Sequence, residues 1–324
     1  MASLSVQGAG PAGSQDQTGV SLDEYKQGTR KSAVSAIRWS LGLILFHTVL
    51  LVVGVIGFSD LSRSLLFIIG VVGLGGGLWE YYQAGDLTAE DLDKQAEAQR
   101  FAQSIEKAPI TYTKAVLACL IVVAVLQQVA GDKESIRAAG LVKGAVWGGE
   151  AWRLFTCATL HANFMHIWMN GQALVGLGRM VESLTNRAYL AMVFLPSAVC
   201  GSVFSLLLMP DSTSVGASGG IMGLVGFLAV LGYRRREMLP AGFFKSVLIN
   251  ICFVGLIGLV GFAVIDNAAH LGGLVAGVSC GAVFIRRAGG AGSAGVSKLV
   301  RGLGLASLVA IAGISLFSIA MILK

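Results

Sequence analysis

Two residues with the chemistry of a nucleophile and a base lie at matching positions in two apolar segments. Ser218 stands sixteen residues before the basic cluster that opens at Arg234, and His270 stands sixteen residues before the pair Arg286-Arg287. At about 1.5 Å of rise per residue, two membrane helices running in the same direction would hold both side chains roughly 24 Å from the basic boundary. Because the hydrocarbon core of a bilayer is about 30 Å thick, both would lie a little below the opposite surface. A serine and a histidine at that depth indicate nucleophilic catalysis inside a membrane.

A second polar pair lies near the start of another apolar segment. His166 and Asn170 are four residues apart, so a helix would present both on one face. Neutral imidazole and amide groups can donate hydrogen bonds to the oxyanion that develops during acyl transfer. The alternative is that both residues form helix–helix hydrogen bonds, which membrane bundles use routinely. The matching depth of Ser218 and His270 favours the oxyanion role.

Glycines accompany both candidate catalytic residues. Gly219 begins a face of small residues on one segment, and Gly273 and Gly277 form such a face on the other. Two such faces would allow the close approach that a serine–histidine hydrogen bond of about 2.6–3.2 Å requires. Asp266 is one turn before His270 and is predicted to lie at the outer surface, so we expect a Ser-His dyad rather than a triad.

The composition indicates a protein that crosses a membrane several times. The chain has 324 residues, of which 55% are hydrophobic and 13% charged, whereas a soluble domain carries about 25% charged residues. The net charge of +6 is spread over the ends of apolar segments. It forms no basic stripe interleaved with aromatic side chains, which argues against nucleic-acid binding. The five cysteines are scattered singly, so neither disulfides nor a thiolate metal site is expected. We also expect no cofactor.

Nine apolar runs approach the length of a membrane span, which is about twenty residues. The runs are Trp39–Phe58, Leu65–Tyr82, Lys114–Ala130, Asn163–Glu182, Ala188–Met209, Ser218–Gly232, Phe243–Phe262, Asn267–Ile285 and Leu303–Leu323. The second run is rich in glycine and contains a glutamate, so it is expected to be a short or re-entrant segment.

The runs and the polar stretches between them divide the chain into six parts. We expect a polar cytosolic tail (1–33), an N-terminal hydrophobic hairpin (34–83), a charged cytosolic connector (84–112), a six-helix core (113–287), a Gly/Ala linker (288–302) and one extra transmembrane helix (303–324). If the N-terminus is cytosolic and all nine runs span, 18 basic residues lie on the inner side and 6 on the outer side. Because basic residues favour the cytosolic side, this orientation places Ser218 and His270 near the outer face.

Taken together, these residues resemble the pattern of the rhomboid intramembrane serine proteases over about Thr111–Arg287. In chain order the matching residues are Trp152-Arg153, His161, His166, Asn170, Glu182, Gly-Ala-Ser218-Gly219, Ala269-His270, Gly273 and Gly277. The resemblance implies an all-α polytopic membrane protein. Its six-helix rhomboid core would be preceded by two extra apolar segments and followed by one extra transmembrane helix.

The resemblance also implies a catalytic role for several residues. Ser218 would be the nucleophile, and His270 would be the general base and acid. His166, Asn170 and the backbone N–H of Ser218 would form the oxyanion hole, with His161 supporting that region. The substrates would be single-span transmembrane proteins that meet the enzyme in the lipid bilayer.

Other matching residues would act around this centre. Trp152 and Arg153 would anchor a loop in the membrane interface, and Glu182 would be a structural hydrogen-bonding residue at the inner end. The fifth core helix (Phe243–Phe262) and the loop after it would gate lateral entry. Met222 departs from the family pattern, because many members carry an aromatic residue four positions after the serine. Its sulfur can still contact an imidazole, so we expect activity.

Two other functions stay open. The chain could be a non-catalytic rhomboid-like protein that binds transmembrane helices, although the presence of both Ser218 and His270 argues against this. It could also be a transporter that uses buried histidines, but the polar residues gather at one depth and form no path across the membrane. Because no transit peptide is evident, we expect a prokaryotic plasma membrane with a cytosolic N-terminus.

Overall fold

The computed structural model describes residues 20–58, 64–261, 265–285 and 297–324. The start of the expected tail, the Arg286-Arg287 pair and most of the expected Gly/Ala linker lie outside the described residues. The chain divides into two compact units, Met1–Arg100 and Phe101–Lys324. Each unit is described by itself.

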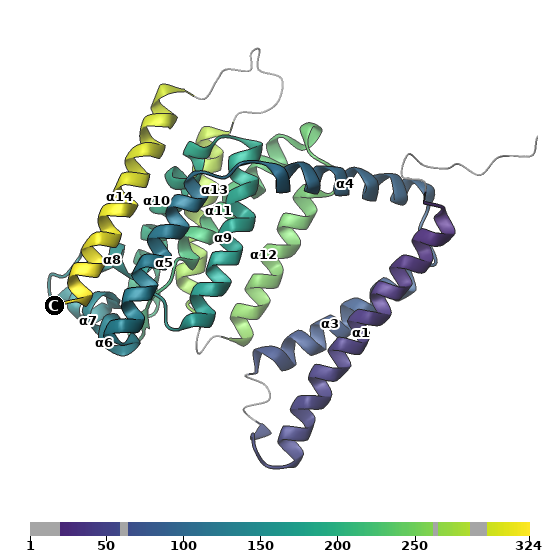
Figure 1. The fold of residues 1–324 in the computed structure, drawn as a ribbon, viewed down its shortest axis with the longest axis horizontal. Coiled ribbons are helices and arrows are strands. Elements are labelled where there is room, and N and C mark those ends of the chain that lie inside the picture. Colours follow the sequence, from purple (N-terminus) through teal and green to yellow (C-terminus); the bar gives the residue numbers. More distant parts are fainter. Residues whose placement is uncertain (1–19, 59–63, 262–264, 286–296) are drawn as a thin grey trace, which may run out of the picture. The chain divides into compact units, whose positions relative to one another are not determined.

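The first unit contains two helices, α1 (Leu22–Val52) and α3 (Leu65–Gln83), which pack antiparallel (Figure 1). A Cβ atom at Gly73 would stand 2.6 Å from Ser40 Oγ, and one at Gly77 would stand 2.9 Å from Ile37 Cγ1. The glycines of α3 therefore serve close packing on α1. The run expected to be short or re-entrant is instead one continuous helix of 19 residues.

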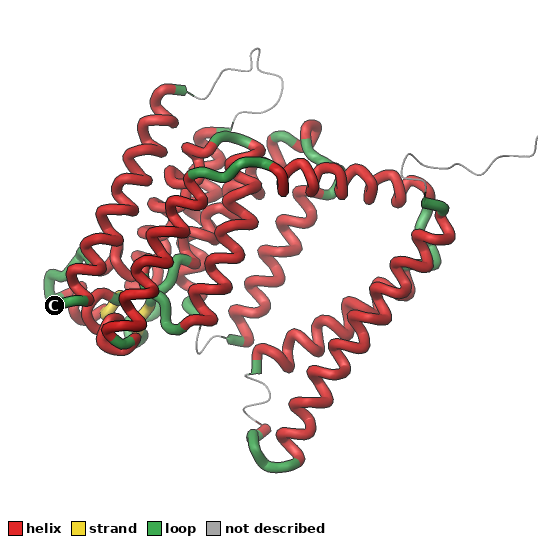
Figure 2. The backbone as a smooth tube through the Cα atoms, in the orientation of Figure 1, coloured by secondary structure: helices red, strands yellow, loops and turns green. Residues whose placement is uncertain are grey.

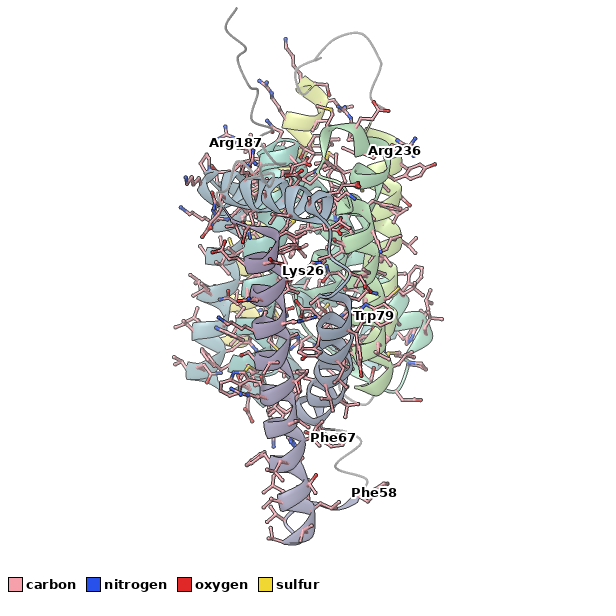
Figure 3. All side chains as sticks on the ribbon, turned by 90° about the vertical axis from the view of Figure 1, so that its right-hand side faces the viewer. Lys26, Phe58, Phe67, Trp79, Arg187 and Arg236 are labelled. Carbon is pink, nitrogen blue, oxygen red and sulfur yellow. The ribbon has the colours of Figure 1, made fainter. Side chains whose placement is uncertain are left out.

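The start of α1 lies within the stretch expected to be a polar tail. Ser21 caps the helix by accepting a hydrogen bond from the N–H of Glu24, while the Glu24 carboxylate accepts one from Ser21 N–H. Such a reciprocal capping box satisfies two N–H groups that a helix end leaves free. Lys26 donates to the carbonyl of Gly85, 3.0 Å away, and lies on α1 in Figure 3. Residues from 22 onward are therefore ordered as helix.

Helix α4 (Ala89–Lys107) accounts for most of the expected charged connector. Thr88 and Asp91 form a capping box at its start, with the Thr88 N–H 2.9 Å from Asp91 Oδ2. Glu90 and Lys94 form an exposed ion pair one turn apart. The helix is polar, and it continues from the first unit into the second.

In the described residues of the second unit, seven long helices form a bundle (Figure 2). They are α5 (Tyr112–Ala130), α9 (Phe164–Leu184), α10 (Arg187–Leu208), α11 (Ser218–Arg234), α12 (Phe243–Val260), α13 (Asn267–Phe284) and α14 (Lys298–Ile322). Phe227, Leu224 and Leu228 on α11 are almost fully buried, so α11 forms the centre of the bundle. Arg187 and Arg236 both lie at the same end of the bundle (Figure 3). The charge pattern predicts that this is the inner end.

Short elements gather at the other end of the bundle, mainly between α5 and α9. They are α6 (Asp132–Ala139), β1 (Leu141–Val142), α7 (Lys143–Trp147), α8 (Arg153–Thr156) and the 3-10 turn η1 (Cys157–Thr159). Strand β1 pairs antiparallel with β2 (Thr213–Ser214), with Leu141 opposite Ser214. This pairing ties the loop to the segment that enters α11. A further 3-10 turn, η2 (Arg236–Met238), follows α11.

Five helices in the described residues are long and apolar enough to cross a membrane. They are α1, α5, α10, α13 and α14, while α11 and α12 are apolar but shorter. The protein is therefore a multi-pass integral membrane protein, and the predicted all-α polytopic fold is confirmed. Each of the nine predicted runs overlaps one helix of the structure, although α1 ends at Val52 rather than Phe58 and Phe262 lies outside the described residues.

The extra C-terminal helix α14 packs along the bundle through α5 and α10. A Cβ atom at Gly304 would stand 2.7 Å from the Cα atom of Ala188, the second residue of α10. At the other end of α14, Ser318 and Thr159 are joined by a hydrogen bond of 2.9 Å. Helix α14 thus runs the length of the bundle and reaches the loop that precedes α9 (Figure 1).

Candidate active site

Helices α11 and α13 pack along a glycine seam. A Cβ atom at Gly273 would overlap the carbonyl oxygen of Gly219, and one at Gly277 would overlap the carbonyl oxygen of Gly223. Each glycine of α13 follows its partner on α11 by the same number of residues, so the two helices run parallel in a fixed register. Only glycines permit such an approach, because any side chain on these faces would push the two backbones apart.

The seam brings the first turns of α11 and α13 together. Ser218 is the first residue of α11 and directly precedes Gly219, while His270 lies on the same face of α13 as Gly273, one turn earlier. A Cβ atom at Gly219 would stand 3.5 Å from the carbonyl oxygen of Ala269, the neighbour of His270. Both Ser218 and His270 are half-buried. The backbones that carry Ser218 and His270 therefore lie close together, and neither residue is fully buried.

No hydrogen bond joins Ser218 to His270 in the described residues. Catalytic hydrogen bonds are often long in an unliganded enzyme and tighten only when substrate binds. The packing of α11 and α13 fixes the backbone positions of Ser218 and His270. The rotamers of the two side chains decide whether the bond forms.

Gly216 shapes the turn that leads into Ser218. Its φ of +130° is a conformation that residues other than glycine rarely adopt, and its N–H donates to the carbonyl of Cys157, 2.9 Å away. A Cβ atom at Gly216 would stand 2.9 Å from His166 Nε2 and 3.6 Å from Asn170 Nδ2. His166 and Asn170 therefore face this turn, as their spacing in the sequence indicates.

Both of these side chains direct an N–H group at the turn. His166 Nδ1 accepts a hydrogen bond of 3.4 Å from the N–H of Ala162, which leaves the ring proton of the neutral imidazole on Nε2. The Asn170 side chain is buried, and its Nδ2 has no hydrogen-bond partner among the described residues. A buried donor without a partner costs about 1–3 kcal/mol. The amide nitrogen of Asn170 is thus a buried donor that no described group satisfies.

His161 supports His166 from one side. The two rings meet edge to face with their centroids 5.1 Å apart, and His161 is only 2% exposed. The Gln127 side chain holds the backbone of His161 at both ends, since it accepts from the His161 N–H (3.0 Å) and donates to the His161 carbonyl (3.1 Å). Gln127 was not among the residues predicted from the sequence. The signal that could have indicated it is an amide side chain within an apolar run of membrane length, because such a group is costly in a membrane unless it has a hydrogen-bond partner.

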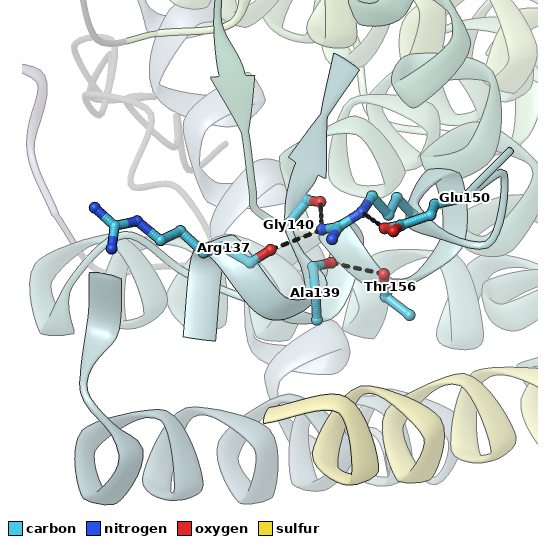
Figure 4. A network of polar contacts seen from close by, with 6 residues as sticks. Arg137, Ala139, Gly140, Glu150 and Thr156 are labelled. Atoms are coloured by element: carbon cyan, nitrogen blue, oxygen red, sulfur yellow. Dashed lines mark hydrogen bonds and ion pairs between the residues drawn. The ribbon is translucent and has the colours of Figure 1, made fainter. Parts of the chain in front are cut away.

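Arg153 organises the loop between α5 and α9 from within. Its Nε donates to Glu150 at 2.5 Å, and one terminal nitrogen donates to the carbonyls of Arg137 and Gly140 at 3.0 and 2.8 Å (Figure 4). The side chain is 7% exposed. Arg153 therefore does not reach into the membrane interface as expected, because the loop uses its charge to satisfy two carbonyls that would otherwise be buried without a partner.

Trp152 connects this loop to the last helix. Its ring lies against the Arg153 guanidinium, 4.6 Å from the ring centroid, and meets the ring of Phe317 on α14 at 5.5 Å. A cation over an aromatic face is attracted to it electrostatically. The contacts of Trp152 are thus made with the protein on both sides, through the loop and through α14.

A polar network links the segments that carry Ser218 and His270. Lys143 Nζ donates to Ser214 Oγ at 2.7 Å, and Ser214 Oγ donates to Asp266 Oδ2 at 2.5 Å. Ser205 also donates to this carboxylate, and Asp266 Oδ1 accepts the Ala269 N–H at 2.9 Å, which caps α13. Burial lowers the pKa of Lys143, and the charge of Asp266 opposes that shift.

This network gives Asp266 more partners than the sequence indicates. Its place at the outer surface of the membrane stays a prediction, while the structure shows a half-buried residue whose carboxylate is shared by two serines and a helix N-terminus. The carboxylate contacts the backbone of the first turn of α13, which also carries His270. Lys143, Ser205 and Ser214 were not predicted at all, because they meet Asp266 only once β1 and β2 have paired.

We expect Asp266→Ala to lower the free energy of unfolding by about 1–3 kcal/mol, since it removes a helix cap and leaves Lys143 buried without a negative charge nearby. Asp266→Asn separates the two effects, because asparagine caps helices as well as aspartate does. Thermal unfolding in detergent should therefore rank the wild type above Asp266→Asn and Asp266→Ala lowest. Equal stability of all three proteins would show that the network around Asp266 does not stabilise the fold.

Glu182 and Met222 are the two other predicted residues. Glu182 accepts hydrogen bonds from the N–H groups of Thr111 and Thr113 at 2.8 and 2.6 Å, so it caps the start of α5 at the opposite end of the bundle. Met222 is buried on α11, four residues after Ser218. Glu182 thus belongs to the scaffold rather than to the site.

The chain is similar to known proteins of one family. Residues 148–287 match the family model described as Rhomboid domain. The chain is 31% identical over 193 residues to "Rhomboid protease GluP" of Bacillus subtilis (strain 168), covering 57% of this chain and 37% of that protein. It is 33% identical over 151 residues to "RHOMBOID-like protein 6, mitochondrial" of Arabidopsis thaliana, covering 44% of this chain and 47% of that protein.

A shorter relative is covered more fully. "Putative rhomboid protease YdcA" of Bacillus subtilis (strain 168) is 31% identical over 133 residues, which is 41% of this chain and 66% of that protein. The chain spans less than half the length of the first two relatives. The matched domain contains Ser218, His270, His166 and Asn170, whereas α1, α3 and α14 lie outside it.

Proposed function

Because the chain belongs to the rhomboid family, we propose that it is an intramembrane serine endopeptidase that cleaves single-span transmembrane proteins with a Ser-His dyad. In this proposal Ser218 is the nucleophile and His270 the general base and acid. The strongest support for the proposal is the amide nitrogen of Asn170. It is a buried donor beside the turn before Ser218, and no group in the described protein accepts a hydrogen bond from it. A donor at this position is suited to a developing oxyanion.

The proposed reaction is acyl transfer in two steps. His270 takes the proton from the Ser218 hydroxyl as the oxygen attacks the scissile carbonyl, and the resulting oxyanion accepts hydrogen bonds from His166 Nε2, Asn170 Nδ2 and the Ser218 N–H. His270 then gives its proton to the leaving amine. Water repeats the sequence on the acyl-enzyme and releases the second product.

The packing of α12 supports lateral entry of a substrate next to this site. Most of its side chains are exposed or half-buried, including the exposed residues Leu248, Ile249, Phe253 and Leu256. A loosely packed helix can move at lower cost than one in the glycine seam. With the cytosolic side assigned by the basic residues, the active site faces the outer side of a plasma membrane that we propose is prokaryotic.

A fluorophosphonate probe tests this assignment, since such probes phosphonylate a serine only when a base activates it. We expect the wild-type protein to be labelled and both Ser218→Ala and His270→Ala to remain unlabelled while folded. Labelling that persists in Ser218→Ala would place the reactive serine elsewhere. A folded wild-type protein that is not labelled would favour a non-catalytic rhomboid-like protein that binds transmembrane helices.

A further inference from the structure

A cavity of about 370 Å³ lies between α5 and α9, on the side of α9 away from Gly216 and α11. Its volume falls within the range of about 300–1,000 Å³ that is usual for small-molecule sites. Away from the outer end, the lining residues come from both helices and are apolar apart from Gln172, among them Leu117, Ile121, Ile167, Trp168 and Val175. Several of these side chains are exposed on the surface of the described bundle, so the cavity opens toward the lipid.

The outer end of the cavity is polar. It is lined by Gln127, Gln128, Asp132, His161 and Asn163. From Leu117 to Gln128 the wall formed by α5 rises roughly 16 Å. The cavity therefore has a long apolar part within the membrane and a polar cap near its surface.

His161 forms part of the wall at this outer end. The residue is 2% exposed and lines the cavity, and both ring nitrogens are buried. Burial lowers the pKa of His161 to about 3, so the ring is neutral. Polar atoms of an occupant at the outer end would therefore lie against an uncharged imidazole.

The charges of the cap select among lipid head groups. Asp132 lines the cavity and is half-buried, and only one of its oxygens accepts a hydrogen bond among the described residues, from the Gln128 amide at 2.8 Å. No lysine or arginine is among the lining residues of this cavity. An anionic head group would meet a carboxylate without a compensating cation, whereas an ammonium group would find an acceptor.

We propose that this cavity binds one membrane phospholipid with a primary ammonium head group, of the phosphatidylethanolamine class. The acyl chain lies between α5 and α9, the ammonium group donates to Asp132, and the glycerol and ester region meets His161. The site is separate from the catalytic assignment, because binding requires neither Ser218 nor His270.

Native mass spectrometry of the detergent-purified full chain tests the proposal, with phosphatidylethanolamine and phosphatidylcholine of identical acyl chains as probes. Phosphatidylcholine has no N–H group, so we expect the wild type to retain phosphatidylethanolamine about tenfold more tightly. Asp132→Asn should reduce this preference about fivefold or more without removing acyl-chain binding.

Filling the apolar part should remove both lipids. Ala124→Phe and Ile121→Trp place bulk on lining positions of α5, whereas Val122→Phe adds a ring to an exposed position of the same helix that does not line the cavity. We expect lipid retention to be lost in either filling variant and kept in Val122→Phe, with thermal unfolding confirming that each protein is folded. Undiminished lipid retention in a folded filling variant would overturn the site. Equal retention of the two lipids by the wild type would overturn the head-group assignment.

Discussion

Replacing Ser218 with alanine is expected to reduce cleavage of a single-span model substrate by at least about 10³-fold, to the background of the assay. The substitution removes the proposed attacking oxygen, and the nearby hydroxyls of Ser205 and Ser214 are held in hydrogen bonds to Asp266. Because Ser218 is half-buried and donates to no other group in the described residues, the variant should unfold at the same temperature as the wild type. The measurement is product formation in liposomes over time.

Two further variants show whether the surrounding donors contribute as proposed. Asn170→Ala removes one oxyanion donor and should lower turnover about 10²–10³-fold, while substrate binding changes little. His270→Ala should be as inactive as Ser218→Ala, because residues that act as one unit give non-additive losses. Cleavage at the wild-type rate by folded Ser218→Ala would remove the serine-protease assignment altogether.

Gly273→Val is expected to abolish activity through the packing of the helices. A side chain at this position would collide with the backbone of Gly219, which cannot move aside as a flexible side chain could. Overpacking usually costs about 1–3 kcal/mol, and a clash with backbone lies at or above the upper end of that range. Separation of α11 from α13 would also draw His270 away from Ser218. Turnover and thermal unfolding should therefore decline together.

The matched control is Gly313→Val on α14, where an added Cβ atom would meet no atom within 4 Å. This variant should keep the stability and activity of the wild type, apart from a small effect of valine on helix propensity. Gly277→Val, one turn further along the seam, should behave like Gly273→Val. A stable and fully active Gly273→Val protein would show that the seam does not set the distance between the two side chains.

The helices and the seam could be predicted from the sequence because both depend on local patterns. Apolar runs of membrane length become helices in lipid, since only internal hydrogen bonds satisfy the backbone there. The spacing of Gly273 and Gly277 indicates a close-packed face without any knowledge of its partner. The spacing of His166 and Asn170 likewise indicates one helix face, and the structure turns both toward Gly216.

The polar contacts of the loop could not be predicted in this way. Asp266, Ser214 and Lys143 lie in three segments that meet only after the chain has passed through several helices. The resemblance assigned Arg153 to anchoring the loop in the interface, but the folded loop gives its guanidinium two backbone carbonyls and a carboxylate as partners. Such partners depend on tertiary structure, which periodicity does not encode.

The hydrogen bond between Ser318 and Thr159 spans 159 positions of the sequence. Thr159 stands two residues before His161, so the last turns of α14 brace the stretch that holds the histidine pair. A version of the protein that lacks α14 would expose the flank of α5 and α10 and release this brace. Attempts to isolate a shorter form of the protein should therefore keep α14, even though it lies outside the matched Rhomboid domain.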